Sequence, residues 1–188
     1  MTELVAIDPG DAKAAGNVCY AARFYDGVLS LCFTLDYATA CACSKPHVVV
    51  IEKPQMDGRS RKTSPRILIN LAWNGALVAG VLRPDKLVPL TPSEWKGGVN
   101  KHPHHMKIWR VLTPDERLVL CAAIGYVRKR AKSITPDGVY ALLLGATKNY
   151  NRTGKVTKHA FYDLLDAVGL GLRYLGRMGG GTYDEDDN

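Results

Sequence analysis

The chain has no even set of cysteines and no long uninterrupted apolar run, and both absences narrow the kind of protein it can be. Its five cysteines are an odd number, and Cys41 and Cys43 lack the second Cys or His pair of a zinc site. We therefore expect reduced, structural thiols. No apolar run approaches the roughly 18 to 20 residues that cross a bilayer, and Met1 leads into a strand without a basic leader. These features predict a cytoplasmic protein that does not enter a membrane.

Aromatic residues make up an ordinary 8%, and 46% of the 188 residues are hydrophobic, which is enough for one domain with a sizeable core. The formal net charge is +7, although a run of four acidic residues lies close to the C-terminus, from Asp184 to Asp187. The body before this run is therefore more basic still, which favours a polyanionic partner such as nucleic acid. We expect a single domain over 1–178 and a disordered acidic tail over 179–188.

The pattern of apolar residues predicts a mixed α/β fold. Asp26 and Gly27 lie between two strand-like runs and are typical of a tight hairpin turn, because both turn positions need positive φ. The first three strands should then be antiparallel, and the fourth should return parallel to the first by a right-handed crossover. Expected strands are 4–8, 16–24, 28–35, 47–52 and 87–90; expected helices are 67–81, 92–97, 104–112, 114–131, 136–146 and a closing helix capped by Thr157.

Four carboxylates occupy positions that call for a chemical reason. Asp8 ends the first buried strand and Glu52 ends the fourth, so parallel pairing would bring them together at neighbouring strand ends. Asp163 and Asp166 are three residues apart on the closing helix and project from one side of it. Oxygen ligands are those that Mg²⁺ prefers. Crowded like charges should also raise some of their own pKa values when no metal is bound.

The sequences Ile7-Asp8-Pro9-Gly10, Val50-Ile51-Glu52 and Asp163-Leu164-Leu165-Asp166, with the Trp95-Lys96-Gly97 region between them, resemble the RuvC family of Holliday-junction resolvases. This family, which has viral members, belongs to the RNase H-like (retroviral integrase) nuclease superfamily. The resemblance implies an RNase H-like five-stranded mixed sheet flanked by helices. It also implies a homodimer that acts on four-way DNA, in a bacterial cell or a virus-infected host cell. The chain departs from the compact family pattern at 113–157, where additional helices are expected.

By the same resemblance, the metal ligands and catalytic residues would be Asp8, Glu52, Asp163 and Asp166. Two Mg²⁺ ions, for which Mn²⁺ should substitute, would clamp an in-line phosphodiester hydrolysis. Asp8 would bridge the two ions, Glu52 would hold one, and Asp163 and Asp166 would share the other. No side-chain nucleophile and no organic cofactor are needed.

Clustered basic residues near the expected site are candidates for phosphate contacts, which position DNA without selecting its sequence. The loop after the Glu52 strand should lie at the mouth of the site, and Met56 is a candidate wedge that unstacks bases at the junction. The expected DNA-binding residues are Arg59, Arg61, Lys62, Arg66, Lys96, Lys101, Lys107, Lys155 and Lys158.

Two further sets of residues have alternative interpretations. His102, His104 and His105 lack the partners of a structural zinc site, so phosphate contact or plain solvent exposure is the expectation. Trp73, Trp95 and Trp109 fall on helical faces and should pack in the core or in a dimer contact rather than stack on bases.

Three alternative functions stay open at this stage. The same nuclease chemistry could act on flaps, other branched DNA or RNA-DNA hybrids. Asp8-Pro9-Gly10 also resembles the phosphate loop of actin-like phosphotransferases, but these need a second lobe with its own Asp-x-Gly motif. A junction-binding protein without catalysis is disfavoured, because all four acidic positions are filled.

Overall fold

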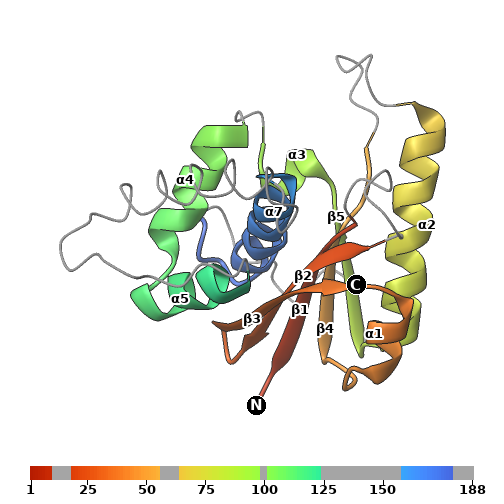
Figure 1. The fold of residues 1–188 in the computed structure, drawn as a ribbon, viewed down its shortest axis with the longest axis horizontal. Coiled ribbons are helices and arrows are strands. Elements are labelled where there is room, and N and C mark those ends of the chain that lie inside the picture. The colour runs from red at the N-terminus through yellow and green to blue at the C-terminus, as the bar shows by residue number, and fades with distance from the viewer. Residues whose placement is uncertain (10–17, 56–63, 98–100, 124–157, 180–188) are drawn as a thin grey trace.

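The computed structural model describes residues 1–9, 18–55, 64–97, 101–123 and 158–179. Its centre is a five-stranded mixed sheet in the order β3-β2-β1-β4-β5 (Figure 1). The first three strands pair antiparallel, whereas β4 runs parallel to both β1 and β5. With helices on both faces, this arrangement confirms the predicted RNase H-like fold class. The strands are β1 (Glu3–Asp8), β2 (Cys19–Tyr25), β3 (Val28–Leu35), β4 (Val48–Glu52) and β5 (Lys86–Leu90).

The β2–β3 turn has the conformation that its sequence predicts. Asp26 and Gly27 have φ values of 47° and 82°, the positive values that a two-residue hairpin with the right twist requires. The turn fixes the register in which Tyr25 faces Val28. The antiparallel half of the sheet follows from this local preference.

Helices cover the sheet in two layers (Figure 1). On one face lie α1 (Tyr37–Ala42) and α2 (Pro65–Leu82). On the other lie α3 (Pro92–Trp95), α4 (Lys101–Val111), α5 (Pro114–Ala123) and α7 (Lys158–Tyr174). Because strand side chains alternate between faces, β1 contributes Val5 and Ile7 to the first core and Leu4 and Ala6 to the second. The next residue on the α7 face is Asp8.

Helix α2 packs one of its faces on the sheet and leaves the opposite face exposed. Val78 and Leu82 of α2 pack on the sheet, but its outer face exposes Ile69, Trp73 and Leu77, with Trp73 70% exposed. No uninterrupted apolar run approaches a membrane span, but α2 as a whole is long and apolar enough, by length and composition alone, to cross a bilayer. Its packed inner face instead fits a sheet-covering helix with an apolar outer surface.

Predicted threonine caps begin α3 and α5. The Thr91 backbone N–H donates to Oε2 of Glu94 at 2.6 Å, and the Thr113 backbone N–H donates to Oε2 of Glu116 at 2.9 Å. In a capping box these are the bonds from the N-cap backbone to the glutamate side chain, and in α5 the Glu116 backbone N–H also donates to Oγ1 of Thr113 at 3.3 Å. The third predicted start at Thr135, most of the expected insertion at 113–157, and residues 180–188 of the expected tail lie outside the described residues.

Glu116 does more than cap α5. Its carboxylate is buried and accepts two hydrogen bonds from the Arg177 guanidinium, at 2.6 and 2.7 Å, and one from the Leu29 backbone N–H. Arg177 also donates to the Gly27 carbonyl. One ion pair thus joins α5, the β2–β3 hairpin and the turn that follows α7.

Candidate metal and nucleic-acid site

Three carboxylates, one from β1 and two from α7, meet at the carboxyl end of β1. Single oxygens of Asp8, Asp163 and Asp166 all lie within 4.8 Å of one another. Asp8 arrives there because it continues the Leu4 and Ala6 face of β1, which α7 covers. The two aspartates of α7 face this strand end rather than solvent, with Asp166 only 3% exposed.

Glu52 lies beside this group but is not one of the three converging residues. β1 and β4 pair in a register that matches Ile7 with Ile51, so Asp8 and Glu52 follow as the next positions. Oε2 of Glu52 accepts hydrogen bonds from the Trp95 indole N–H at 2.8 Å and from Lys96 at 3.3 Å.

Lys96 joins Glu52 to the aspartates. Its ammonium lies 3.3 Å from Oε2 of Glu52 and 3.9 Å from Oδ2 of Asp166. The two carboxylate oxygens can therefore be no farther apart than the sum of these distances. All four predicted ligands lie around one small volume at the strand ends.

A second lysine enters the same volume from α4. The Lys101 ammonium lies 2.9 Å from Oδ2 of Asp166 and 3.7 Å from Oδ1 of Asp163. Burial alone would lower the pKa of Lys101, but Asp166, Asp163 and Asp8 raise it, so it stays charged. Four carboxylates then face two ammonium groups, and the excess of negative charge suits divalent cations.

His105 holds the remaining oxygen of Asp166. Its imidazole is fully buried and lies with Nε2 2.7 Å from Oδ1 of Asp166. The ring packs against Tyr162, with centroids 4.9 Å apart. Because an ionised carboxylate only accepts, Nε2 carries the proton and donates it.

The expectation that crowding raises carboxylate pKa values is wrong for Asp166. Burial alone would raise its pKa, but the hydrogen bond from His105 and the charges of Lys96 and Lys101 outweigh burial and hold it well below its ordinary value. The cations folded in among the carboxylates remove the predicted repulsion at this residue. Asp166 is therefore ionised, and its carboxylate is held in one orientation by His105.

Tyr20, which pairs with Asp8 across β1 and β2, was not anticipated from the sequence. Burial raises its pKa, and the charges of Asp163 and Asp8 raise it further. Burial and Asp8 likewise raise the pKa of the Cys19 thiol to about 12. Both groups stay protonated, and neither offers a nucleophile at neutral pH.

The expected exposure of the histidines is also wrong. His104 and His105 are buried, at 4% and 0% exposure, and the side chain of His102 lies outside what the structure describes. The spacing of His105 with Ile108, Trp109 and Leu112 marks the inner face of α4 and could have revealed this burial. Trp95 and Trp109 are buried as expected, whereas Trp73 is not in the core.

The expected DNA-binding residues fall into three groups. The ammonium groups of Lys96 and Lys101 contact the carboxylates, and the Lys101 side chain is also half exposed to solvent. Arg66, in the first turn of α2, and Lys107 on α4 are exposed. Arg59, Arg61, Lys62, Lys155 and the candidate wedge Met56 lie outside the described residues, as does the side chain of Lys158.

Gly169 on α7 leaves room for the Trp95 ring beside the carboxylates. A Cβ at Gly169 would lie 2.7 Å from Cζ3 of Trp95 and 2.6 Å from Cδ1 of Ile108, closer than real Cβ contacts. Trp95 can therefore lie against α7 with its indole N–H on Glu52. The missing side chain thus positions one of the four carboxylates.

Comparisons with known proteins give a weak likeness. No family model and no curated protein matches the chain. Two solved structures align at 13% identity: a Thermus thermophilus RuvC structure, with a TM-score of 0.35 over 83% of this chain and 99% of that one, and T. thermophilus RuvC in complex with a Holliday junction substrate, with a TM-score of 0.37 over 84% and 99%. The sheet order and the carboxylate geometry above are independent of this likeness.

Proposed function

We propose that the chain is a metal-dependent endonuclease that resolves four-way DNA junctions. The observation that carries the proposal is the convergence of Asp8, Asp163 and Asp166 within 4.8 Å, with Glu52 joined to them through Lys96. Carboxylates of this number at the ends of parallel strands form a site for hard cations and phosphate oxygens. We place the activity in one domain over 1–178, with an insertion at 113–157, and in the cytoplasm.

The residues present fit divalent metal. Every candidate ligand atom is a carboxylate oxygen, and Asp166 has one oxygen fixed by His105 while Oδ2 faces the site. Asp8, Asp163, Asp166 and Glu52 would hold two Mg²⁺ ions, or Mn²⁺ in their place. Such ions make bound water more acidic and neutralise charge on a phosphate.

The chain's own residues would orient the carboxylates and neutralise charge on the DNA phosphate. Trp95 and Lys96 hold Glu52 in one orientation, and His105 does the same for Asp166. Lys101, whose side chain is 51% exposed, can turn outward to a DNA phosphate when cations replace its charge. Lys96 is less exposed, at 21%, and stays beside the reacting phosphate.

The partner that resolution requires is a second copy of the chain, because two strands must be cut. The outer face of α2 offers a surface for it: Ile69, Trp73 and Leu77 form a stripe at four-residue spacing, each at least 43% exposed. An exposed apolar stripe of this kind marks an interaction surface. We therefore place the dimer contact on α2.

Cleavage mapping tests the proposal. The protein is incubated with a synthetic four-way junction, a flap, a fork and an RNA-DNA hybrid, each with Mg²⁺, Mn²⁺ or Ca²⁺. Paired symmetric nicks in the four-way junction, with Mg²⁺ or Mn²⁺ but absent in Asp8→Asn, are expected. If flaps or RNA-DNA hybrids are cut faster than the four-way junction, they are the substrate instead. If no substrate is cut, the chain is not a nuclease.

A further inference from the structure

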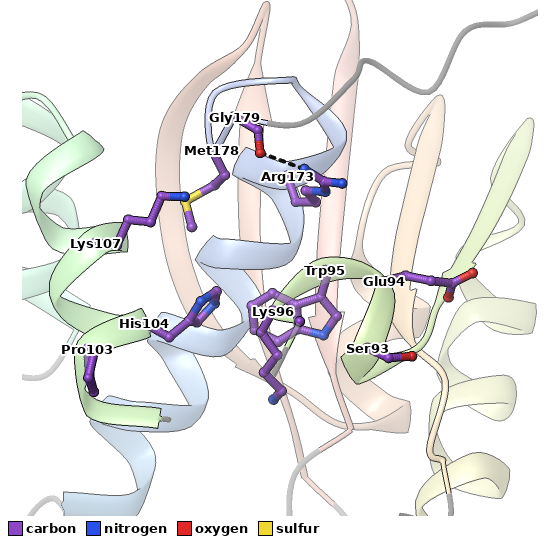
Figure 2. A pocket seen from close by; sticks show the side chains of 11 residues that line it. Ser93, Glu94, Trp95, Lys96, Pro103, His104, Lys107, Arg173, Met178 and Gly179 are labelled. Atoms are coloured by element: carbon purple, nitrogen blue, oxygen red, sulfur yellow. Dashed lines mark hydrogen bonds between the residues drawn. The ribbon is translucent and has the colours of Figure 1, made fainter. Parts of the chain in front are cut away.

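A cavity of about 320 Å³ lies next to the carboxylate cluster and shares Trp95 and Lys96 with it. Its walls come from α3, from α4 and from the end of α7 with the turn that follows (Figure 2). Ligand pockets for small organic groups begin at roughly 300 Å³. The cavity is thus large enough for one heteroaromatic ring and part of its sugar, and it adjoins the atoms that would hold the scissile phosphate.

His104 gives this cavity an unsatisfied polar atom. The side chain is 4% exposed, and its Nε2 has no hydrogen-bond partner among the residues that the structure describes. The ring extends from α4 toward Trp95 (Figure 2), against which it packs edge to face with centroids 4.9 Å apart. A buried polar atom without a partner costs about 1 to 3 kcal/mol, and a ligand that bonded to Nε2 would remove this cost.

Burial lowers the pKa of His104 to about 4, which leaves the imidazole neutral at neutral pH. A neutral ring can donate from one nitrogen and accept at the other. This suits the edge of a nucleobase, which mixes donors and acceptors, better than a phosphate, which only accepts.

The rest of the lining includes apolar side chains, cationic side chains, the Ser93 hydroxyl and the Glu94 carboxylate. Trp95 and Met178 supply apolar surface, and both are buried. Lys107 and Arg173 supply charge, and Arg173 is oriented by a 2.7 Å hydrogen bond from Nη1 to the Gly179 carbonyl (Figure 2). An aromatic and thioether surface beside cations is typical of a site that takes a base and its flanking phosphates.

We propose that this cavity receives one unstacked nucleobase of the strand cut at the carboxylate cluster, with the base edge bonded to Nε2 of His104 and the flanking phosphates on Lys107 and Arg173. The inference rests on the proposed function and adds to it a source of nucleotide preference at the cut. Taking a base out of the stack costs least where pairing is already broken, as at a branch point. The cavity therefore selects both the branch and the base.

Abasic scanning tests the pocket in the full-length protein. A series of four-way junctions carries one abasic site each, stepped along the cut strand, and cleavage is compared between the native protein and His104→Phe. Phenylalanine keeps the ring against Trp95 and removes both nitrogens. One position is expected where loss of the base slows the native protein about tenfold and leaves His104→Phe unchanged. Superimposable profiles for the two proteins would overturn the pocket.

Two further variants guard this result. His104→Gln replaces the imidazole with an amide that can still form a hydrogen bond to the base. Its cleavage should therefore still slow when the base at the sensitive position is removed, and this result can be obtained even if His104→Phe fails to fold. Lys107→Met should weaken junction binding at every position, whereas Lys86→Met, which removes an exposed lysine from the opposite end of β5, should not. Equal binding by the two lysine variants would contradict the phosphate contact.

A second arm separates this inference from the nuclease proposal. Saturation-transfer NMR on Asp8→Asn, with each of the four deoxynucleoside monophosphates as probe, needs no cleavage. A base-proton signal that His104→Phe removes supports the pocket even if no junction is cut. A signal that is absent, or unchanged by His104→Phe, overturns the pocket even if junctions are resolved.

Discussion

Nε2 of His105 lies 2.7 Å from Oδ1 of Asp166, inside a fully buried contact between α4 and α7. The contact fixes Oδ1 and leaves Oδ2 directed at the Lys101 and Lys96 ammonium groups, beside Asp8 and Asp163. A residue that hydrogen-bonds to a metal-binding side chain fixes the orientation of that side chain. Removing such a hydrogen bond typically lowers metal affinity by about 10- to 100-fold.

We therefore expect His105→Leu to weaken Mn²⁺ binding by about tenfold or more while the protein stays folded. His105→Gln, which can still donate to Asp166, should recover part of the affinity. Isothermal titration of both variants measures this. Native Mn²⁺ affinity in the leucine variant would show that the histidine only fills space.

Replacing Gly169 by alanine should destabilise the protein, although helix propensity alone predicts that it would stabilise it. Alanine is ordinarily better than glycine in a helix by about 1 kcal/mol, but here its Cβ would meet Trp95 and Ile108 at 2.7 and 2.6 Å. We expect Gly169→Ala to destabilise the protein by about 1 to 3 kcal/mol. Urea unfolding measures the difference.

Gly80 of α2 is the matched control, because a Cβ there meets nothing within 4 Å. Gly80→Ala should keep or slightly raise the free energy of unfolding. If the two substitutions behave alike, the close approach of Trp95 to α7 is not real.

Glu116 predicts how stability depends on pH. Burial alone would raise its pKa, but hydrogen bonds from Arg177 and from the Leu29 and Thr113 backbone lower it from 4.5 to about 2. A carboxylate whose folded pKa is depressed stabilises the protein above its unfolded pKa. This contribution is lost as pH falls from 4.5 toward 2.

Glu116→Gln should cost about 3 kcal/mol at pH 7, because it leaves Arg177 without its ion-pair partner, and should flatten the stability curve in that acid range. Asp115→Asn removes an exposed charge from the same turn of α5 and should keep the native pH dependence. Thermal melts from pH 2 to pH 7 compare the two. An unchanged acid transition in Glu116→Gln would count against the ion pair.

Trp73 predicts the assembly state. It is 70% exposed in the middle of the apolar stripe on α2, so a charge there should block self-association. Light scattering should give a dimer for the native chain and a monomer for Trp73→Glu. Leu118→Glu, at an exposed apolar position on α5, should stay dimeric. A native monomer would exclude this contact.

Sequence reasoning succeeded where the chain's preferences are local. The φ values at Asp26 and Gly27, the capping glutamates Glu94 and Glu116, and the alternation that ends β1 and β4 in acids depend on neighbours within a few residues. The convergence of Asp8 with Asp163 and Asp166 follows once the strand order is known. Sequence reasoning therefore predicted the strand pairing and the convergence of the three aspartates.

The remaining features depend on contacts across the fold. Whether His105 is buried, where the Lys96 and Lys101 ammonium groups turn, and which atom binds Glu52 are decided by the packing of α4 and α7 on the sheet. Helical spacing marks an inner face but does not say what an inward polar group meets there. The cavity beside His104 has no sequence signature for the same reason.

Metal binding by the carboxylate cluster is the central claim, and manganese titration followed by electron paramagnetic resonance tests it most directly. The native protein should show saturable Mn²⁺ binding that Mg²⁺ displaces, and Asp8→Asn and Asp166→Asn should lose it with their near-UV circular dichroism unchanged. Native-like Mn²⁺ binding in both folded variants would contradict the account.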